Sequence, residues 1–322
     1  MKLTRKEAEK ISSNYNLGKL KTFKELSGGL VNYNYVLTTQ KGKFVVKVLG
    51  NRLTSYKRKG LDLEFKVLTF LKNSDFPYKV PEPVKNKRGK CLGRLNKKNY
   101  WVYELLVGVE ERNLNDKKLK EFVKALSLYH KQIKTFKTKN KYNPNHSQWI
   151  RGALNSMQKI KGKGKIDKLI MKNLDFFKNL FDSLQKTDFT QNLLPAHRDF
   201  TLDNLLFNKG KIIAIIDFGN IEIKPRIYDI ANSIMDSCFE NNILNKKKFK
   251  LFLKEYEKIN KLSIKEKKAI ILFILVELCG FLCWYYKGMK KDSGKRYFRL
   301  KRTVSMAKNL AELSKKGFDW IT

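Results

Sequence analysis

One polar run and one distant acid carry the residue types that phosphoryl transfer needs. The run His-Arg-Asp-Phe-Thr-Leu-Asp-Asn occupies positions 197–204, and Asp217 follows thirteen residues after Asn204. Such chemistry requires one Asp to accept a hydroxyl proton, and an Asn and a second Asp to hold Mg²⁺ on ATP phosphates. We therefore take Asp199 as the candidate base and Asn204 and Asp217 as candidate metal ligands.

The segment between these residues predicts a hairpin that brings the metal ligands together. Two apolar runs, 205–207 and 212–216, flank an Asn-Lys-Gly loop at 208–210, whose glycine tolerates a positive φ. We expect Asn204 to lie opposite Asp217, with Cβ atoms about 4.5–5.5 Å apart, close enough to share one small hard cation. An ordinary hairpin with polar caps would account for any one of these residues, but not for the ordered set.

An upstream sheet predicts a phosphate-binding partner for this hairpin. The expected strands are 20–26, 33–38 and 44–48, and Gly28 and Gly29 lie in the turn between the first two. Two adjacent glycines let the backbone approach phosphate oxygens closely. The turn is therefore a candidate part of a nucleotide site.

Lys47 is the single cation on an otherwise apolar face of the third strand. A buried ammonium needs an anion, which ATP phosphates and Glu64, in a helix-like stretch at 61–71, would supply. Asp62 is the competing carboxylate, although Glu64 flanks the apolar series of that stretch. A solvated strand-edge lysine is the alternative interpretation of Lys47.

A further strand at 100–106 is expected to end the sheet-rich part of the chain. Backbone groups near Glu104 and Leu106 are our candidates for pairing with adenine, although peptide groups leave no sequence signature. We expect an N-terminal nucleotide-binding lobe at 1–106 and a C-terminal catalytic and substrate-binding lobe at 107–322.

These motifs resemble the protein-kinase-like superfamily, and within it the family of aminoglycoside phosphotransferases, choline kinases and type II homoserine kinases. The resemblance covers roughly residues 20–233, and its motifs are the Gly28-Gly29 turn, Lys47, a Leu-x-His helix end at 128–130, the 197–204 run, Asp217 and Tyr-Asp-Ile-Ala at 228–231. It implies an α+β, bilobal protein-kinase-like fold with an antiparallel-sheet N-lobe and a mostly helical C-lobe.

The same resemblance implies a role for each motif. Asp199 would be the catalytic base, Asn204 and Asp217 would bind Mg²⁺, and Lys47 would hold the α- and β-phosphates of ATP. Asp229 would brace the catalytic loop. Arg198 departs from the family pattern, since most such phosphotransferases have Gly there.

Arg198 and the Asp-Phe-Gly at 217–219 raise the alternative of a protein kinase. Protein kinases place Lys two residues after the catalytic Asp, carry a G-x-G-x-x-G loop and have a long activation segment. Here Thr201 occupies the Lys position, no such glycine loop exists, and eleven residues separate Asp217 from Asp229. A small-molecule kinase is the better interpretation.

The acceptor is less clearly indicated than the reaction. The segment 30–35 and the Leu-Asp-Asn-Leu-Leu-Phe at 202–207 are similar to type II homoserine kinases, whereas Gly219 is unusual for them. Homoserine is our first choice, with aminoglycosides, choline or sugars as alternatives. Candidates for an amine-binding pocket come from the C-terminal helices, although each also suits packing or the surface: Asp236, Glu240, Glu277, Trp284 and Tyr285.

Composition leaves one alternative of another class. The chain has 322 residues, 42% of them hydrophobic, and a formal net charge of +39 that requires nucleic-acid binding to be considered. The lysines are scattered through helical patterns and no RNA-reading aromatic motif accompanies them, so we expect a solvated lysine-rich surface and no nucleic-acid partner. A catalytically idle nucleotide- or RNA-binding protein on the same fold is the remaining alternative.

The segment 269–286 approaches the length and apolarity of a membrane span. Glu277 lies near its middle and lysines flank both ends, so we expect a buried helix of the second lobe and no membrane partner. The N-terminus is charged, unlike a signal peptide. Four cysteines without a C-x-x-C pair favour reduced thiols in the cytoplasm.

Overall fold

The computed structural model describes residues 2–26, 32–50, 54–111, 114–142, 145–162, 164–184, 190–287 and 293–317. The chain divides into two compact units, one of residues 1–111 and 203–221 and the other of residues 112–202 and 222–322. The predicted glycine turn at Gly28 and Gly29 lies outside the described residues. The lobe boundary after residue 106 stays a prediction, because compactness does not identify which part binds the nucleotide.

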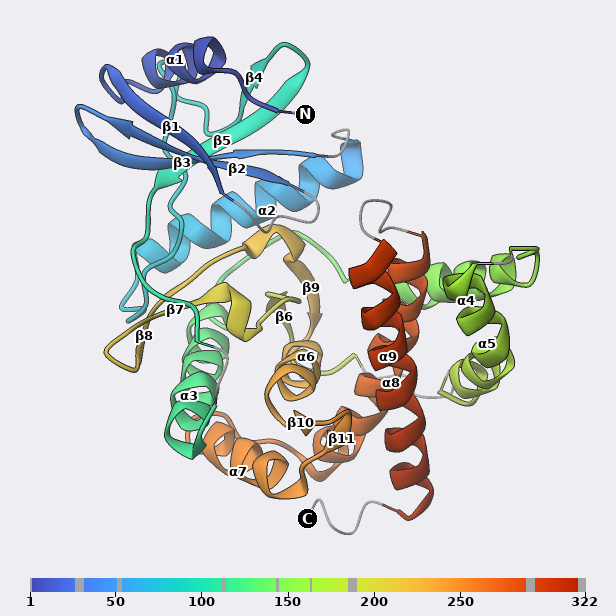
Figure 1. Cartoon of the computed structure of the whole chain (residues 1–322). Coiled ribbons are helices and arrows are strands. Elements are labelled where there is room, and N and C mark those ends of the chain that lie inside the picture. Colours follow the sequence, from blue (N-terminus) through green and yellow to red (C-terminus); the bar gives the residue numbers. More distant parts are fainter. Residues whose placement is uncertain are drawn as a thin grey trace. The chain divides into compact units, whose positions relative to one another are not determined.

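The first unit is built on an antiparallel five-stranded sheet with strand order β1-β2-β3-β5-β4 (Figure 1). Its strands are β1 (Leu20–Leu26), β2 (Tyr33–Thr39), β3 (Gly42–Val48), β4 (Gly93–Leu95) and β5 (Lys98–Glu104). The strands predicted from alternation are thus confirmed, with ends that differ by up to two residues.

One helix covers each face of this sheet. Because successive side chains of a strand point to opposite faces, alternate residues of β3 face different helices. Phe44, Val46 and Val48 belong to an apolar cluster that includes Ala8 and Ile11 of α1 (Arg5–Asn14) and Tyr15, the C-cap residue of that helix. On the other face, α2 (Ser55–Lys72) packs Phe65 edge-on against Trp101, with ring centroids 5.4 Å apart. Lys47 has the same parity as Val45 and therefore faces α2.

The hairpin of β7 (Leu205–Asn208) and β8 (Lys211–Ile215) belongs to the first unit although it lies far along the sequence. Val109 and Phe207 exchange two backbone bonds of 2.9 and 2.8 Å, and Lys79 bonds Ile213 and Ile215 at 2.9 Å each. Gly108 allows the close approach, since a Cβ there would lie 2.8 Å from Leu206 Cβ.

The second unit is mostly helical. Its helices are α3 (Asp116–Ile133), α4 (Asn145–Met157), α5 (Lys165–Leu184), α6 (Ile227–Ser237), α7 (Lys246–Glu257), α8 (Ile264–Lys287) and α9 (Ser293–Lys315). Two short antiparallel pairs accompany them, formed by β6 (Leu193–Ala196) with β9 (Glu222–Pro225) and by β10 (Phe239–Glu240) with β11 (Ile243–Leu244).

Helix α8 is the one described helix long and apolar enough to cross a membrane, and 67% of its most apolar window is buried within the structure. It packs against α4, α5, α6 and α9. Glu277 in its middle pairs with His146 of α4 at 3.2 Å. The helix is thus the buried core helix that the sequence predicted.

An ion pair locks the start of the first unit to its sheet. The ammonium of Lys98 contacts both carboxylate oxygens of Glu7 at 2.9 and 2.8 Å, and the Thr4 amide donates to the same carboxylate at 2.9 Å in a capping box. Burial would raise the pKa of Glu7, but the bonds from Lys98 and Thr4 lower it from 4.5 to about 2.

We predict that Glu7→Gln lowers the free energy of unfolding by about 3 kcal/mol at pH 7, because it leaves a poorly solvated ammonium without its partner. The folded pKa lies below the unfolded one, so the stabilisation is present above pH 4.5 and is lost as pH falls toward 2. Urea denaturation at pH 7 and pH 3.5 measures both effects. Glu9→Gln is the matched control, since Glu9 forms an exposed pair with Arg5 on the same helix; an equal loss in both variants would contradict the prediction.

Candidate active site

The first unit brings together three of the predicted residues around one ammonium. Lys47 Nζ lies 2.6 Å from Asp217 Oδ1 and 3.9 Å from Glu64 Oε1. Lys47 and Glu64 are both buried, whereas the side chain of Asp217 is 49% exposed. Asp62 is exposed, so the structure favours Glu64 as the lysine's helix partner.

The electrostatics of this trio follow from its burial. Burial alone would lower the pKa of Lys47, but the charges of Asp217 and Glu64 raise it above its ordinary value. Burial raises the pKa of Glu64 from 4.5 to about 7, against the opposing effect of Lys47. The ammonium is therefore firmly charged, while Glu64 carries its proton more readily than a surface carboxyl.

The predicted hairpin is confirmed, but its predicted register is wrong by one residue. Ile216 N donates to Asn204 O at 2.9 Å, so Asn204 pairs one position before Asp217. The loop has two residues, Lys209 and Gly210, both with positive φ, and a bulge between Leu206 and Phe207 shifts the ladder. Asn204 and Asp217 still lie at the same open end of the hairpin.

Asp217 itself has left-handed backbone angles, φ 57° and ψ 61°. A Cβ on Gly219 would lie 3.3 Å from both Asp217 Oδ1 and Lys47 Nζ. Glycine at position 219 therefore keeps the space beside the ion pair free of a side chain. This is a local physical reason for a glycine that is unusual for type II homoserine kinases.

The adenine candidates lie at the end of β5. The side chain of Glu104 is exposed and that of Leu106 is half-buried, and between them Leu105 N donates to Lys43 O at 2.9 Å. Their role in nucleotide binding stays a prediction.

In the second unit, a fully buried carboxylate holds the backbone around Asp199. Asp229 accepts from His197 N at 2.8 Å and from Arg198 N at 2.6 Å, and it lies 3.1 Å from His130 Nε2. His130 Nδ1 lies 2.7 Å from the Tyr256 hydroxyl. Arg198 has a φ of 62°, which is an uncommon conformation for a residue other than glycine. The hydrogen bonds from the amides of His197 and Arg198 to Asp229 stabilise this conformation.

Further side chains of α6 hold the rest of the loop. Asn232 donates to Arg198 O at 3.0 Å, Ser233 donates to Phe200 O at 2.9 Å, and Asp236 accepts from Leu202 N at 2.8 Å. Together with Asp229 these residues occupy positions i, i+3, i+4 and i+7, which is one face of a helix. Sequence reasoning missed Asn232 and Ser233, although a polar stripe on a buried helix was the available signal.

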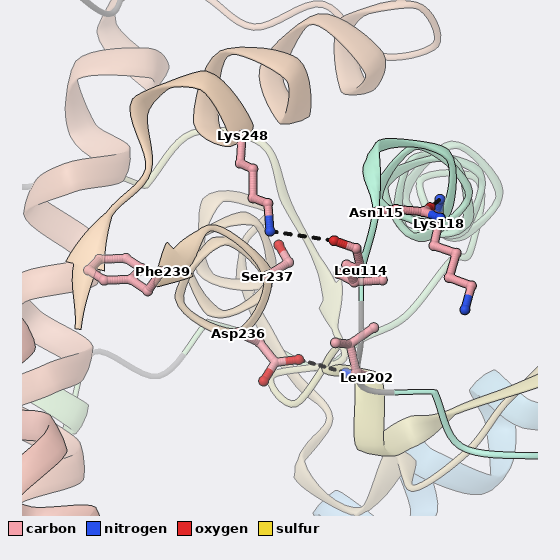
Figure 2. A pocket seen from close by; sticks show the side chains of 8 residues that line it. All are labelled: Leu114, Asn115, Lys118, Leu202, Asp236, Ser237, Phe239 and Lys248. Carbon is pink, nitrogen blue, oxygen red and sulfur yellow. Dashed lines mark hydrogen bonds between the residues drawn. The ribbon is translucent and has the colours of Figure 1, made fainter. Parts of the chain in front are cut away.

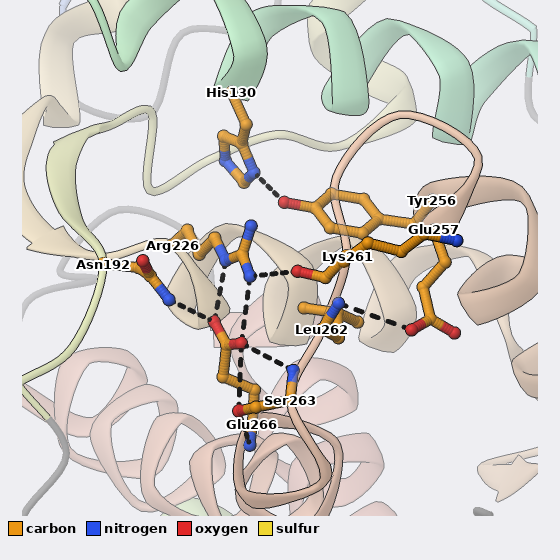
Figure 3. Close-up of polar contacts among 9 residues, drawn as sticks. All are labelled: His130, Asn192, Arg226, Tyr256, Glu257, Lys261, Leu262, Ser263 and Glu266. Atoms are coloured by element: carbon orange, nitrogen blue, oxygen red, sulfur yellow. Dashed lines mark hydrogen bonds and ion pairs between the residues drawn. The ribbon is translucent and has the colours of Figure 1, made fainter.

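Helix α6 is itself anchored at its start. Figure 3 shows the Arg226 guanidinium donating to both oxygens of Glu266, at 2.7 and 2.9 Å. Glu266 also accepts from Asn192 and from Ser263 at the start of α8. This shared carboxylate ties the beginnings of α6 and α8 together, which fixes the stripe that holds the loop.

A cavity of about 430 Å³ adjoins the end of the loop at Leu202 (Figure 2). Its walls include Asp236, Ser237 and Phe239, and Lys248, which donates to Leu114 O at 3.4 Å. Lys248 also pairs with Glu240 at 2.7 Å.

The five residues proposed for an amine-binding pocket have other contacts. Asp236 serves the loop, Glu240 pairs with Lys248, and Glu277 pairs with His146. Trp284 and Tyr285 contact each other with ring centroids 5.1 Å apart. The three acids therefore have structural partners, as the packing and surface alternatives predicted.

Comparisons with known proteins place this chain in a family. Solved structures with the same fold include an amicoumacin kinase in complex with AMP-PNP and Ca²⁺ (TM-score 0.70, 18% identity, 97% of this chain and 95% of that one) and a spectinomycin phosphotransferase in complex with ADP and spectinomycin (TM-score 0.69, 15% identity, 97% and 100%). A microcompartment-associated aminopropanol kinase matches with TM-score 0.69 and 15% identity over 98% of this chain and 100% of that one.

Residues 22–250 match the model of the phosphotransferase enzyme family, and the chain belongs to that family. Its relatives include the homoserine kinases of Bradyrhizobium diazoefficiens (25% identity, 84% of this chain and 83% of that one) and Nitrobacter hamburgensis (28% identity, 83% and 82%). The small-molecule kinase class and the α+β kinase-like fold expected from the sequence are confirmed.

We predict that Glu64 makes folding stability fall as pH rises. Its folded pKa of about 7 lies above the unfolded 4.5, so its contribution is full below pH 4.5 and is lost as pH passes through 7, by up to about 3 kcal/mol. Urea denaturation of wild type and Glu64→Gln from pH 5 to 8 tests this, since the variant should lack that slope. The exposed Asp62→Asn is the control, and parallel pH curves for all three proteins would refute the assignment.

We predict that Ser233→Ala loosens the loop, because it leaves the buried Phe200 carbonyl without its donor, at a cost of about 1–2 kcal/mol. Amide hydrogen exchange in 197–202 should become faster. Ser237→Ala is the matched control: this buried serine of the same helix donates to Ser233 O and lies 3.5 Å from Cys238 Sγ, and both partners are outside residues 197–202. Faster loop exchange in both variants would show that the contact to Phe200 is not the cause.

Proposed function

We propose that this protein transfers the γ-phosphoryl group of ATP to the hydroxyl of homoserine, with Mg²⁺ as its metal ion. The observation that carries the proposal is the trio of Lys47, Glu64 and Asp217, on the same unit as Asn204, in a chain of the phosphotransferase enzyme family. The homoserine kinases among its relatives support the acceptor.

The donor atoms at the hairpin end suit magnesium. Asn204 and Asp217 offer amide and carboxylate oxygens, the ligands that Mg²⁺ prefers, and phosphate oxygens would complete the coordination. Among the residues that the structure describes, no cluster of three His, Cys, Asp or Glu side chains forms a metal site by itself. The two protein donors, Asn204 and Asp217, therefore suit a site in which nucleotide phosphates supply further ligands. When bound, the ion would neutralise charge that develops on the leaving phosphate oxygens.

The remaining roles belong to side chains. Lys47, held by Glu64, would bind the α- and β-phosphates. Asp199 would orient the acceptor hydroxyl and take its proton. As the new bond forms between the acceptor oxygen and the γ-phosphorus, the bond from that phosphorus to the β,γ-bridging oxygen breaks and ADP leaves with the electron pair.

Chain connectivity supports this division of labour. Asp199 is five residues before Asn204, so even an extended chain limits their Cα separation to about 17 Å. The turn at Leu202–Asn204 shortens that span further. This limit on the distance from Asp199 to Asn204 is compatible with the roles proposed for the two residues.

Two other functions remain as alternatives. Membership of the phosphotransferase enzyme family is compatible with an aminoglycoside, choline or sugar acceptor, and the solved structures with the same fold include kinases of amicoumacin, spectinomycin and aminopropanol. The formal net charge of +39 is the observation that supports the second alternative, a catalytically idle nucleotide- or RNA-binding protein. We propose no particular RNA as its partner. Four free cysteines support a cytoplasmic location.

We predict that Asp199→Asn abolishes ATP-dependent phosphorylation of homoserine, by about 10³-fold or more, while the affinity for ATP changes little. Coupled ADP release measures turnover, and calorimetric titration with ATP and Mg²⁺ measures binding. Asp203→Asn, in the same loop, is the control and should retain most activity.

A substrate screen separates the candidate functions. Wild-type ADP release should be fastest with homoserine among amino alcohols, choline, sugars and aminoglycosides. Faster turnover of an aminoglycoside would identify an aminoglycoside, and not homoserine, as the acceptor. RNA binding without turnover of any hydroxyl compound would favour the idle nucleotide- or RNA-binding protein over an enzyme. Unchanged activity of Asp199→Asn would reject the base assignment.

A further inference from the structure

Arg198 is the residue directly before the candidate base, and its φ of 62° lies in the left-handed region. Glycine adopts this region without strain, whereas the Cβ of any other L-residue crowds the following carbonyl oxygen. The hydrogen bonds from Asp229 and Asn232 reach only the backbone of Arg198 and would serve a glycine equally well. An interaction that offsets the conformational cost of the arginine must therefore involve its side chain.

The Arg198 guanidinium contacts a carboxylate that is not part of the loop. Its Nη1 donates to Glu222 Oε2 at 2.9 Å, and both side chains are partly buried. Glu222 begins β9, and its partner across the ladder is Ala196, two residues before Arg198. An ion pair at this depth is screened less by solvent than a surface pair, so it can offset a conformational cost in the backbone.

Glu222 is itself held from its own strand. Lys224 lies two residues along β9, on the same face, and its ammonium is 3.6 Å from the same oxygen, Oε2. The buried ammonium of Lys224 lies over the rings of Tyr142 and Tyr228, 4.9 and 5.6 Å from their centroids. Burial lowers the pKa of Lys224, and the charge of Glu222 raises it. Glu222 is therefore a carboxylate between two cations, one of which is packed against aromatic rings.

Arg198 is thus bound through its amide and its carbonyl oxygen by α6 and through its guanidinium by β9. The carbonyl belongs to the planar peptide group that joins Arg198 to Asp199, so its orientation sets where the backbone of Asp199 begins. We propose that Arg198 and Glu222 are positioning residues, whose ion pair holds this peptide group so that the Asp199 carboxylate is aimed at the acceptor hydroxyl. The inference rests on the proposed function, in which Asp199 takes the acceptor's proton.

A contact that only aims the base has a characteristic kinetic signature. It contributes to the rate of the chemical step, because misplacement of a reacting group by about 1 Å can cost about 100-fold in rate. It contributes little to the binding of either substrate, so kcat should fall while the KM values stay. General damage to the fold would not separate the two constants in this way.

The test measures kcat and KM for ATP and homoserine in Arg198→Gln, Glu222→Gln and the double variant. Each single variant should lower kcat about 10- to 100-fold, and both KM values should stay within about threefold of wild type. The double variant should lose no more than either single variant, since the two residues act through one contact. Arg198→Gly should be faster than Arg198→Gln, because glycine adopts the required φ without strain.

Glu257→Gln is the matched control. Glu257 of α7 pairs with Lys267 of α8 at 2.9 Å, with side chains 22% and 21% exposed, and Glu222 and Arg198 pair at the same distance with 25% and 19%. Its kcat should stay within about threefold of wild type. Arg198→Gln leaves Lys224 beside its carboxylate, so this variant should fold even if Glu222→Gln does not. Thermal melting of each variant verifies the fold.

The outcomes separate this inference from the proposed function. Wild-type turnover of homoserine with an unchanged kcat in Arg198→Gln would uphold the function and overturn the inference. Losses that multiply in the double variant, an equal loss in Glu257→Gln, or an Arg198→Gly variant no faster than Arg198→Gln would also overturn it. A raised KM in Arg198→Gln alone would instead make the guanidinium a substrate ligand, and a wild type inactive on every hydroxyl compound would reject both proposals.

Discussion

The second unit depends on a carboxylate with no access to water. A carboxyl group at 0% exposure is costly unless it is hydrogen-bonded, and Asp229 accepts from two backbone amides and lies 3.1 Å from an imidazole nitrogen. The amides are available only if the chain at 197–198 bends, with Arg198 at a positive φ. The desolvation of one acid thereby fixes the backbone from which Asp199 projects, and α3, α6 and α7 each supply a group to the same network.

The first unit solves a comparable problem with the opposite charge. Lys47 is buried between a sheet and α2, and two carboxylates of different character surround it. Glu64 comes from a helix packed on the sheet, whereas Asp217 comes from a hairpin that backbone bonds attach at both edges. Lys47 can therefore make both contacts only when its own strand, α2 and the hairpin are all correctly packed.

Much of this arrangement was predictable because short-range patterns carry it. Alternation in β3 identified Lys47, and the apolar series after Glu64 identified the helix face that meets it. The hairpin register was not predictable, since the bulge at Leu206 and the tight loop at Lys209 have no distinctive residue type. The bounds of helix α9 were not predicted, because scattered lysines obscure its buried series at Leu300, Val304 and Ala307. The partners of Asp236, Glu240 and Glu277 were not predictable, because the loop amide, the lysine and the histidine that they contact are distant in the sequence or carry no distinctive spacing.

The hairpin of residues 203–221 also bears on how such a protein can be taken apart or recombined. Because it folds with residues 1–111, the chain crosses from one unit to the other at three points along its length. A gene segment that encodes the first 111 residues would deliver Lys47 and Glu64 without Asn204 and Asp217. Each unit thus consists of two separate stretches of sequence, so neither can be fused to another protein or exchanged as one continuous segment.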